Sequence, residues 1–142
     1  GKNIPFEEKV IKEKLDSISF RGPDFMGIDK IKNLTFGHLR LSILDLDSRS
    51  NQPMIHENLT IVFNGEIYNY KAIKKELLEL DYNFKTESDT EVLLIGYKHW
   101  GTAILDKING MFAFSIYDAD LNTLAYTMPQ QISCFLQEID WE

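Results

Sequence analysis

The segment LTIVFNGEIYNY, residues 59–70, contains the strongest structural signals in this sequence. Its opening residues 59–63 are apolar or β-branched, which predicts a short buried strand. Asn64-Gly65 follows, and this dipeptide after an apolar strand is the commonest hairpin signal. Asn69 carries a side-chain oxygen that can accept hydrogen bonds from the first turn of a helix. The stretch therefore predicts a strand, a sharp corner and the start of a helix.

Downstream, two helices and a pair of strands are predicted. The first helix has an apolar face formed by Ile73, Leu77, Leu78 and Leu80. The second runs from 89 to 100 and is stopped by Gly101. Before it, SDTE at 88–91 predicts a capping box, in which Ser88 and Glu91 satisfy each other's free backbone donors. MFAFSIY at 111–117 alternates as a strand, and a turn leads to a partner strand at 123–126.

Upstream, FEEKVIKEKLDSIS at 6–19 has apolar residues at helical spacing and predicts a helix. RGPD at 21–24 breaks it as a tight loop, and residues 34–46 are expected to hold a strand that runs into a loop. Near the C-terminus a short helix is predicted, because apolar residues recur at helical spacing at Ile132, Phe135, Leu136 and Ile139. Strands and helices in mixed order, with hairpin signals, indicate an α+β fold with helices packed on sheet faces.

Composition narrows the function classes. The chain has 142 residues, of which 44% are hydrophobic, enough for one domain with a real core. The net charge of −7 disfavours nucleic acid and anionic membranes as partners, and no apolar run approaches a membrane span. A single cysteine rules out an internal disulfide and favours a reducing, cytoplasmic compartment. The three histidines have no partner at metal-ligand spacing, so no metal is expected.

Six segments together carry a resemblance to a known family. They are RGPD at 21–24, GHLRLSILDL at 37–46, QPM at 52–54, FNGEIYNY at 63–70, SDTEVLL at 88–94 and NGMFAF at 109–114. In order and spacing they resemble the glutaminase domain of class II glutamine amidotransferases, most closely that of the glutamine-hydrolysing asparagine synthetases. The resemblance assigns residues 1–126 to the domain and leaves 127–142 as a divergent tail. It implies an N-terminal-nucleophile fold, a four-layer αββα sandwich of antiparallel sheets, here incomplete at both ends.

The resemblance also implies a chemistry. A cysteine at the mature N-terminus attacks the side-chain amide of glutamine, its own α-amine acts as the base, a thioester forms and ammonia leaves. Ammonia would pass to a synthetase domain in which ATP, with magnesium, activates aspartate. No cofactor is expected in this chain itself.

Matched positions suggest how glutamine is held at its amide. Asn64 and Gly65 correspond to the oxyanion hole, since a side-chain amide and a backbone N–H are suitable fixed donors for a tetrahedral intermediate. Glycine lets the backbone approach closely, without a Cβ in the way. The alternative is that Asn-Gly is simply a hairpin turn.

Other matched positions suggest how the charged end of the ligand is held. Arg40 corresponds to the residue that binds the α-carboxylate, with backbone groups of Leu41, Ser42, Ile43 and Leu44 around the ligand. Asp89 corresponds to the acid that holds the α-ammonium, with Glu66 as a second acceptor. For Arg40 the alternative is an exposed arginine on a half-buried strand. For Asp89 it is an acid stabilised by the dipole of its helix.

The sequence also departs from the pattern. The resemblance places the nucleophile in a strand before the first helix, whereas this sequence opens at Gly1 and has its one cysteine at Cys134. We expect Cys134 to be a buried structural thiol and the chain as given to have no glutaminase activity. Two further readings stay open. One is a non-catalytic glutamine-binding or interaction module, and the other is the glutaminase domain of a different class II enzyme that amidates sugars, peptides or polysaccharides. Unpaired sheet edges would favour self-association, so a homodimer is a third expectation.

Overall fold

The computed structural model describes residues 8–32, 34–40, 51–128 and 131–138. The helical elements in this part of the chain are α1 (Glu8–Ser17), η1 (Ser19–Arg21), α2 (Tyr70–Glu79), α3 (Asp89–Trp100) and η3 (Gly101–Asp106). The strands are β1 (Phe25–Ile31), β2 (Leu34–Arg40), β3 (Met54–His56), β4 (Leu59–Ile67), β5 (Gly110–Asp118), β6 (Thr123–Met128) and β7 (Gln131–Glu138).

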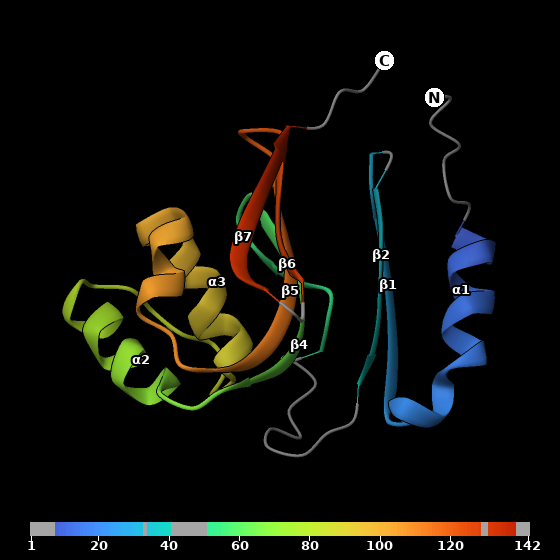
Figure 1. Ribbon diagram of the computed structural model, residues 1–142, viewed down its shortest axis with the longest axis horizontal. Helices are drawn as coiled ribbons and strands as arrows, with labels where there is room; N and C mark the ends of the chain where they lie inside the picture. The colour runs from blue at the N-terminus through green and yellow to red at the C-terminus, as the bar shows by residue number, and fades with distance from the viewer. Residues whose placement is uncertain (1–7, 33, 41–50, 129–130, 139–142) are drawn as a thin grey trace.

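These elements stack in layers (Figure 1). Helices α2 and α3 cover one face of a five-stranded antiparallel sheet with the order β3-β4-β5-β6-β7. The two-stranded sheet of β1 and β2 lies on the opposite side, and α1 covers its outer face. Two antiparallel sheets between helical layers are the αββα arrangement that the resemblance implied. That prediction of the fold class is confirmed.

The main core lies between the five-stranded sheet and α3. Alternate residues of β4, among them Leu59, Ile61 and Phe63, point into it, as the period-two geometry of a strand requires. All residues of α3 from Thr90 to Tyr97 are buried, so this helix is enclosed almost all round. Each large apolar side chain buried here contributes roughly 1.5–3 kcal/mol. This layer is therefore expected to contribute most to the stability of the fold.

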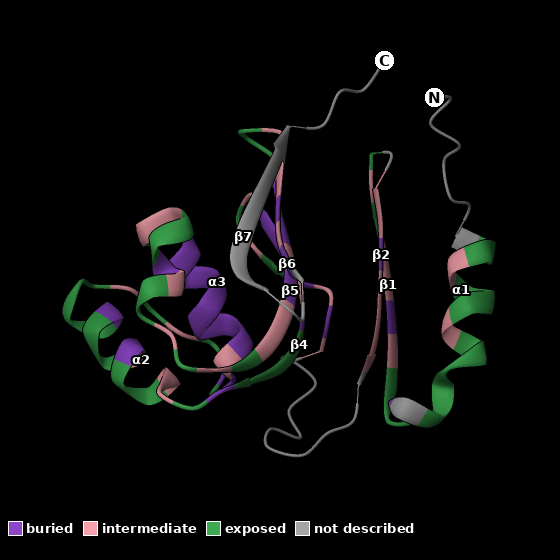
Figure 2. Cartoon of the chain, viewed as in Figure 1, coloured by how far each residue is buried: buried purple, intermediate pink, exposed green. Residues whose placement is uncertain are grey.

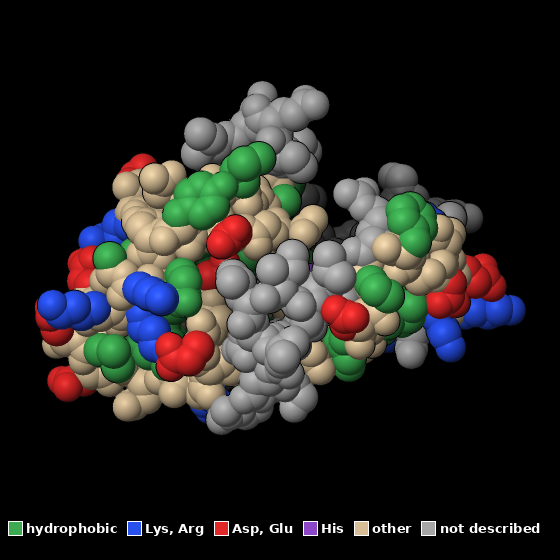
Figure 3. Space-filling model, turned by 90° about the horizontal axis from the view of Figure 1, so that it is seen from below, with side chains coloured by type: hydrophobic (Ala, Val, Ile, Leu, Met, Phe, Trp, Pro, Cys, Tyr) green, Lys and Arg blue, Asp and Glu red, His purple; other side chains and the backbone are tan. Residues whose placement is uncertain are grey.

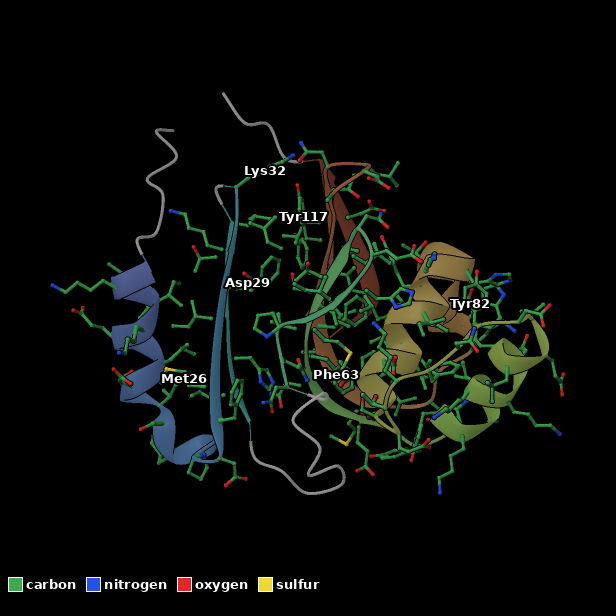
Figure 4. The ribbon with its side chains drawn as sticks, turned by 180° about the vertical axis from the view of Figure 1, so that it is seen from behind. Met26, Asp29, Lys32, Phe63, Tyr82 and Tyr117 are labelled. Carbon is green, nitrogen blue, oxygen red and sulfur yellow. The ribbon has the colours of Figure 1, made fainter. Side chains whose placement is uncertain are left out.

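The opposite faces of β4 and β5 point toward the two-stranded sheet. Tyr117 on β5 is fully buried, yet it does not belong to the core beneath the helices. Figure 4 shows its ring between the two sheets. Its hydroxyl donates to Asn122 Oδ1 at 3.0 Å, which satisfies the one polar atom that the ring carries into this layer. The sheets are thus packed against each other at this end of the sandwich.

The described surface mixes charges of both signs. Seen from below, lysine and arginine side chains are interspersed with acidic ones and form no continuous basic stripe among the side chains drawn in colour (Figure 3). No helix in the described part of the chain combines the length and hydropathy needed to cross a bilayer.

The expected end of the strand at Asn64-Gly65 is wrong, and so is the alternative of a hairpin turn there. β4 continues through both residues to Ile67, and Asn64 pairs with Ala113 while Gly65 pairs with Phe112. Asn-Gly favours a turn because both residues tolerate positive φ, but here the long partner strand β5 offers a complete ladder of hydrogen bonds. Tertiary pairing overrides the local signal.

The helix predicted for the tail is also wrong. β6 extends to Met128, and residues 131–138 form strand β7, which pairs antiparallel with β6. Leu136 lies opposite Ala125 and Phe135 opposite Tyr126. The apolar residues have helical spacing, but the segment meets the open edge of β6 and pairs with it along its length. Pairing at that edge decides the outcome.

Two helix caps differ in detail from the prediction. The side chain of Asn69 does not cap α2; its Oδ1 accepts from the Asn109 N–H at 2.7 Å and its Nδ2 donates to the Lys107 carbonyl. Ser88 Oγ does accept from the Glu91 N–H at 3.2 Å, so half of the capping box is present. The Glu91 carboxylate instead turns to the preceding loop, described below.

One expectation about side-chain burial also fails. On α2 only Ile73 and Leu77 of the expected apolar face are buried, whereas Leu78 and Leu80 are exposed. Tyr68, toward the end of the FNGEIYNY segment nearest this helix, is exposed as well.

Candidate functional site

The outer edge of β4 is the centre of the candidate site. β3 pairs with β4 only as far as Ile61, and no described strand covers this edge beyond it. Side chains take the place of a strand. The Phe63 N–H donates to Gln52 Oε1, and the Phe63 carbonyl accepts from His38 Nε2 at 3.0 Å. Farther along, the Ile67 N–H donates to Asp89 Oδ2 at 3.0 Å.

Gly65 lies between these two positions on the same edge. In an antiparallel ladder the N–H groups of residues two apart point to the same side, so the Gly65 N–H follows those of Phe63 and Ile67. None of the side chains that the structure describes accepts a hydrogen bond from it. Backbone donors normally find a partner, and within the described part of the chain this one is open to an added acceptor.

Only glycine fits at position 65. Its φ is +141°, a region that side-chain-bearing residues rarely adopt, and a Cβ there would lie 2.1 Å from the Met111 carbonyl oxygen. The close approach of β5 fixes this conformation. The sequence analysis also favoured glycine here for close backbone approach, but in the oxyanion hole rather than against a partner strand.

Asn64 and Glu66 flank this amide on the face of β4 away from the core. Phe63 and Ile67 are core residues, and alternation along the strand directs the side chains between them toward the two-stranded sheet. Both side chains are exposed. A ligand oxygen bonded to the Gly65 N–H would therefore have the Asn64 carboxamide close by as a second donor.

Asp89 approaches the same edge from the first residue of α3. Its side chain is half-buried, and burial is the main cause that raises the pKa of its carboxyl group above the ordinary value of 3.8. Backbone N–H groups, first that of Ile67, oppose the shift, and the charge of Glu66 adds to it. The helix dipole would favour a carboxylate here, yet the direction of the shift shows that loss of water dominates. An approaching cation would relieve that cost.

A buried network holds the start of α3 in place. The Glu91 carboxylate accepts from the Lys85 N–H at 2.8 Å, from the Thr86 N–H at 2.7 Å and from the Thr86 hydroxyl at 2.6 Å. Thr86 Oγ1 in turn accepts from the Ser88 N–H at 3.2 Å. The loop before Asp89 is therefore tied to the helix that carries it, which fixes where its carboxylate lies.

The predicted carboxylate-binding segment is described only at its start. Arg40 is the last residue of β2, opposite Phe25 and two residues after His38. Because the His38 ring reaches the Phe63 carbonyl, this end of β2 lies close to the edge of β4. The Arg40 side chain and Leu41, Ser42, Ile43 and Leu44 lie outside the described residues.

Sequence reasoning missed two residues that shape this edge. Gln52 belongs to the quoted QPM motif but received no role, and His38 was considered only as a metal ligand. Gln52 is buried, with 7% of its surface exposed, which is unusual for a glutamine. This burial marks it as a structural residue, but burial of a single polar residue cannot be read from the sequence.

Comparison with known proteins identifies the family. A profile described as a glutamine amidotransferase domain matches residues 2–127. The chain is 42% identical over 120 residues to asparagine synthetase [glutamine-hydrolyzing] 1 of Bacillus subtilis, a match that covers 83% of this chain and 19% of that protein. The chain belongs to the glutamine amidotransferase domain family.

This glutamine amidotransferase domain also resembles proteins that are not named as asparagine synthetases. It is 35% identical over 116 residues to the amidase chyE of Penicillium rubens, covering 80% of this chain and 17% of that protein. Among solved structures it resembles the glutamine phosphoribosylpyrophosphate amidotransferase of B. subtilis, with a TM-score of 0.54 and 24% identity, over 66% of this chain and 22% of that one. The last match shows the fold alone. The domain spans about a fifth of the length of the curated relatives it matches.

Proposed function

We propose that this domain binds glutamine and is the ammonia-supplying part of a glutamine-hydrolysing asparagine synthetase. The observation that carries the proposal is the Gly65 N–H, which no described side chain engages, between two neighbours that side chains do engage. Together with Asn64 it offers two donors to an oxygen that gains negative charge during amide hydrolysis. The hairpin alternative for this dipeptide no longer competes, since both residues lie inside β4.

The charged end of glutamine would lie between Asp89 and Arg40. Asp89 is half-buried with a raised pKa, and its Oδ2 already accepts one backbone bond. An α-ammonium beside it would replace the lost water and stabilise the carboxylate. The guanidinium of Arg40 would hold the α-carboxylate by two parallel hydrogen bonds, and Glu66 would be a second acceptor for the ammonium. Backbone groups of 41–44 would line the ligand.

Hydrolysis needs a thiol close to the Asn64–Gly65 edge, and Cys134 is not suited to the task. It lies on β7, and the sheet order places β5 and β6 between that strand and β4. Three strand spacings amount to about 14 Å. We therefore propose that a cysteine at a mature N-terminus performs the attack, and that the 142 residues alone bind glutamine without releasing ammonia.

The acceptor of the ammonia would be a synthetase domain that activates aspartate with ATP and magnesium, in the cytoplasm. The match to asparagine synthetases supports aspartate as the acceptor. The match to an amidase favours a second candidate, in which the same domain supplies ammonia to another acceptor. Assays of the full-length protein with aspartate and without it separate the two. A homodimer through unpaired sheet edges is a further part of the proposal, and sedimentation would test it.

Calorimetry with the 142-residue chain tests the binding step. We expect saturable binding of glutamine, weaker binding of glutamate, whose carboxylate would face the oxyanion donors without the amide nitrogen, and no ammonia release. Addition of a cysteine-led first strand should start ammonia release. Steady release by the 142 residues alone would overturn the assignment of the nucleophile, binding without release after the addition would favour a non-catalytic module, and no binding at all would overturn the function.

A further inference from the structure

The side chain of Gln52 joins two segments of the site that are far apart in the sequence. Its Oε1 accepts from the Phe63 N–H, and its Nε2 donates to Thr90 Oγ1 at 3.4 Å. Gln52 and Thr90 are 7% and 4% exposed, so little water competes for these bonds. A carboxamide suits the position because one rigid planar group supplies an acceptor and a donor.

Each partner of Gln52 is the neighbour of a candidate ligand-binding residue. Phe63 precedes Asn64, which begins the amide-binding edge, and Thr90 follows Asp89, the candidate partner of the α-ammonium. The carboxamide therefore bridges the two ends of the proposed site without reaching the ligand itself. We propose that Gln52 is a positioning residue that fixes the span between the Asn64–Gly65 edge and Asp89, and so selects glutamine by the length of its side chain. This inference rests on the proposed function.

The bridge is also backed from behind by the two-stranded sheet. A Cβ at Gly27 of β1 would lie 1.7 Å from the Gln52 carbonyl oxygen, so the backbones meet directly there. Gln52 cannot move toward β1 without a clash, and its side chain is held on the opposite side by β4 and α3. Because both ends of the Gln52 carboxamide are bonded and its backbone lies against β1, the distance between Phe63 and Thr90 is fixed.

A fixed span matters because glutamine and asparagine have identical charged ends and identical amides and differ by one methylene. One methylene is worth roughly 10–200-fold in discrimination when the site cannot adapt. If the edge of β4 and the start of α3 could shift relative to each other, the shorter ligand would bridge both. Gln52, together with the bond from the Ile67 N–H to Asp89, removes that freedom.

The test compares binding of glutamine and asparagine to the full 142-residue chain by calorimetry. Gln52→Leu keeps the approximate volume and removes both bonds, and we expect the preference for glutamine, expressed as a ratio of Kd values, to fall about tenfold. Gln52→Glu should restore most of the ratio, because its carboxylate accepts from Phe63 and the Thr90 hydroxyl can turn to donate. Thr90→Val leaves the bond from Phe63 to Gln52 intact. It should lower the ratio of Kd values by about threefold, an effect between those of Gln52→Leu and Gln52→Glu.

Thr127→Val is the matched control for Thr90→Val. Thr127 is likewise a buried threonine, whose Oγ1 accepts from the Phe114 N–H at 3.1 Å, but it lies on β6, away from the edge. A smaller folded fraction weakens the binding of both ligands by the same factor. The ratio of the two Kd values is therefore insensitive to loss of folded protein. Equal loss of both affinities in Gln52→Leu, or an altered ratio in Thr127→Val alone, would overturn the positioning role while glutamine binding still stood. A wild-type chain that binds neither amino acid would remove the proposed function, and this inference with it.

Discussion

The two halves of the sandwich differ sharply in how they are packed. In the five-stranded sheet and its helices, buried residues run through α3 and the central strands, whereas α1, β1 and β2 are mostly half-buried or exposed (Figure 2). Among the described residues of that second half, Phe36 is the one large apolar side chain that is buried. Contacts between the halves include the bond from His38 to the Phe63 carbonyl and the contact of Gly27 with Gln52.

The candidate ligand-binding residues are divided between these halves. Asn64, Gly65 and Asp89 lie on the well-packed half, and Arg40 ends a strand of the other. Local opening free energies follow packing, so the half with α1 should open first. The candidate amide-binding residues thus lie in the well-packed half, whereas the position of Arg40 depends on how the less well-packed half lies against it.

A leucine-to-alanine substitution should lower the free energy of unfolding far more in the well-packed half than in the half with α1. Leu94→Ala, in the fully buried middle of α3, is expected to lower the free energy of unfolding by about 4 kcal/mol, through lost transfer energy and a cavity. Leu15→Ala, half-buried on α1, should cost about 1 kcal/mol. Urea unfolding measures both. Equal losses would contradict the contrast between the halves.

Gly65→Ala should break the rigid half at the site itself. The added Cβ would meet the Met111 carbonyl and would need a positive φ, so we expect a loss of about 3 kcal/mol in stability and no detectable glutamine binding. Gly101→Ala is the matched control: φ there is +58° and no atom lies within 4 Å of a Cβ, so a loss of about 1 kcal/mol is expected. Similar losses at the two positions would show that the close strand approach at 65 does not matter.

Arg40→Ala should affect the ligand and spare the fold. Loss of a bidentate bond to a carboxylate is expected to weaken glutamine binding about 50-fold, within the range of roughly 1.5–3 kcal/mol for a hydrogen bond to a charged group. Lys30→Ala on β1 removes the same charge from an exposed position of the same sheet and should leave affinity unchanged. Calorimetry provides both values. Unchanged binding in Arg40→Ala would count against the assignment of Arg40.

Asp89→Asn should separate function from stability. We expect glutamine affinity to fall about tenfold, since the charge beside the α-ammonium is lost. Stability at neutral pH should be equal or slightly higher, because the amide oxygen can still accept from the Ile67 N–H and no half-buried charge remains.

The pH dependence follows from the raised pKa of Asp89. In the wild type the folded state holds this proton more tightly than the unfolded chain, so ionisation costs stability as pH rises through the folded pKa. The stability difference between Asp89→Asn and the wild type should therefore shrink as pH falls from neutral toward the ordinary value of 3.8. A variant clearly less stable than the wild type at neutral pH would favour the alternative, an acid kept for its helix dipole.

Much of the fold was predictable because local signals and tertiary contacts agree over most of the chain. The helix at 89–100, its stop at Gly101 and the strand at 111–117 follow from periodicity and caps, and the structure has all three. Where they disagree, an available strand edge wins. Asn64-Gly65 is drawn into the ladder by β5, and the tail is drawn onto β6 despite its helical spacing.

The candidate site was predictable only as far as a motif names residues. The structure brings Asn64, Gly65 and Asp89 to one edge of β4. What the sequence could not supply is the partner of each backbone group. The bonds from Gln52 and His38 to Phe63 join residues 11 and 25 positions apart, and no local pattern encodes them.

The contact between Gly27 and the Gln52 carbonyl has a last consequence. At that point the backbone of β1 lies directly against the backbone of the segment before β3, with no side chain between them. Any larger residue at position 27 would push the two-stranded sheet, which carries Arg40, away from the half of the molecule that carries Asp89. The absence of a side chain at position 27 is therefore what allows the two backbones to come this close.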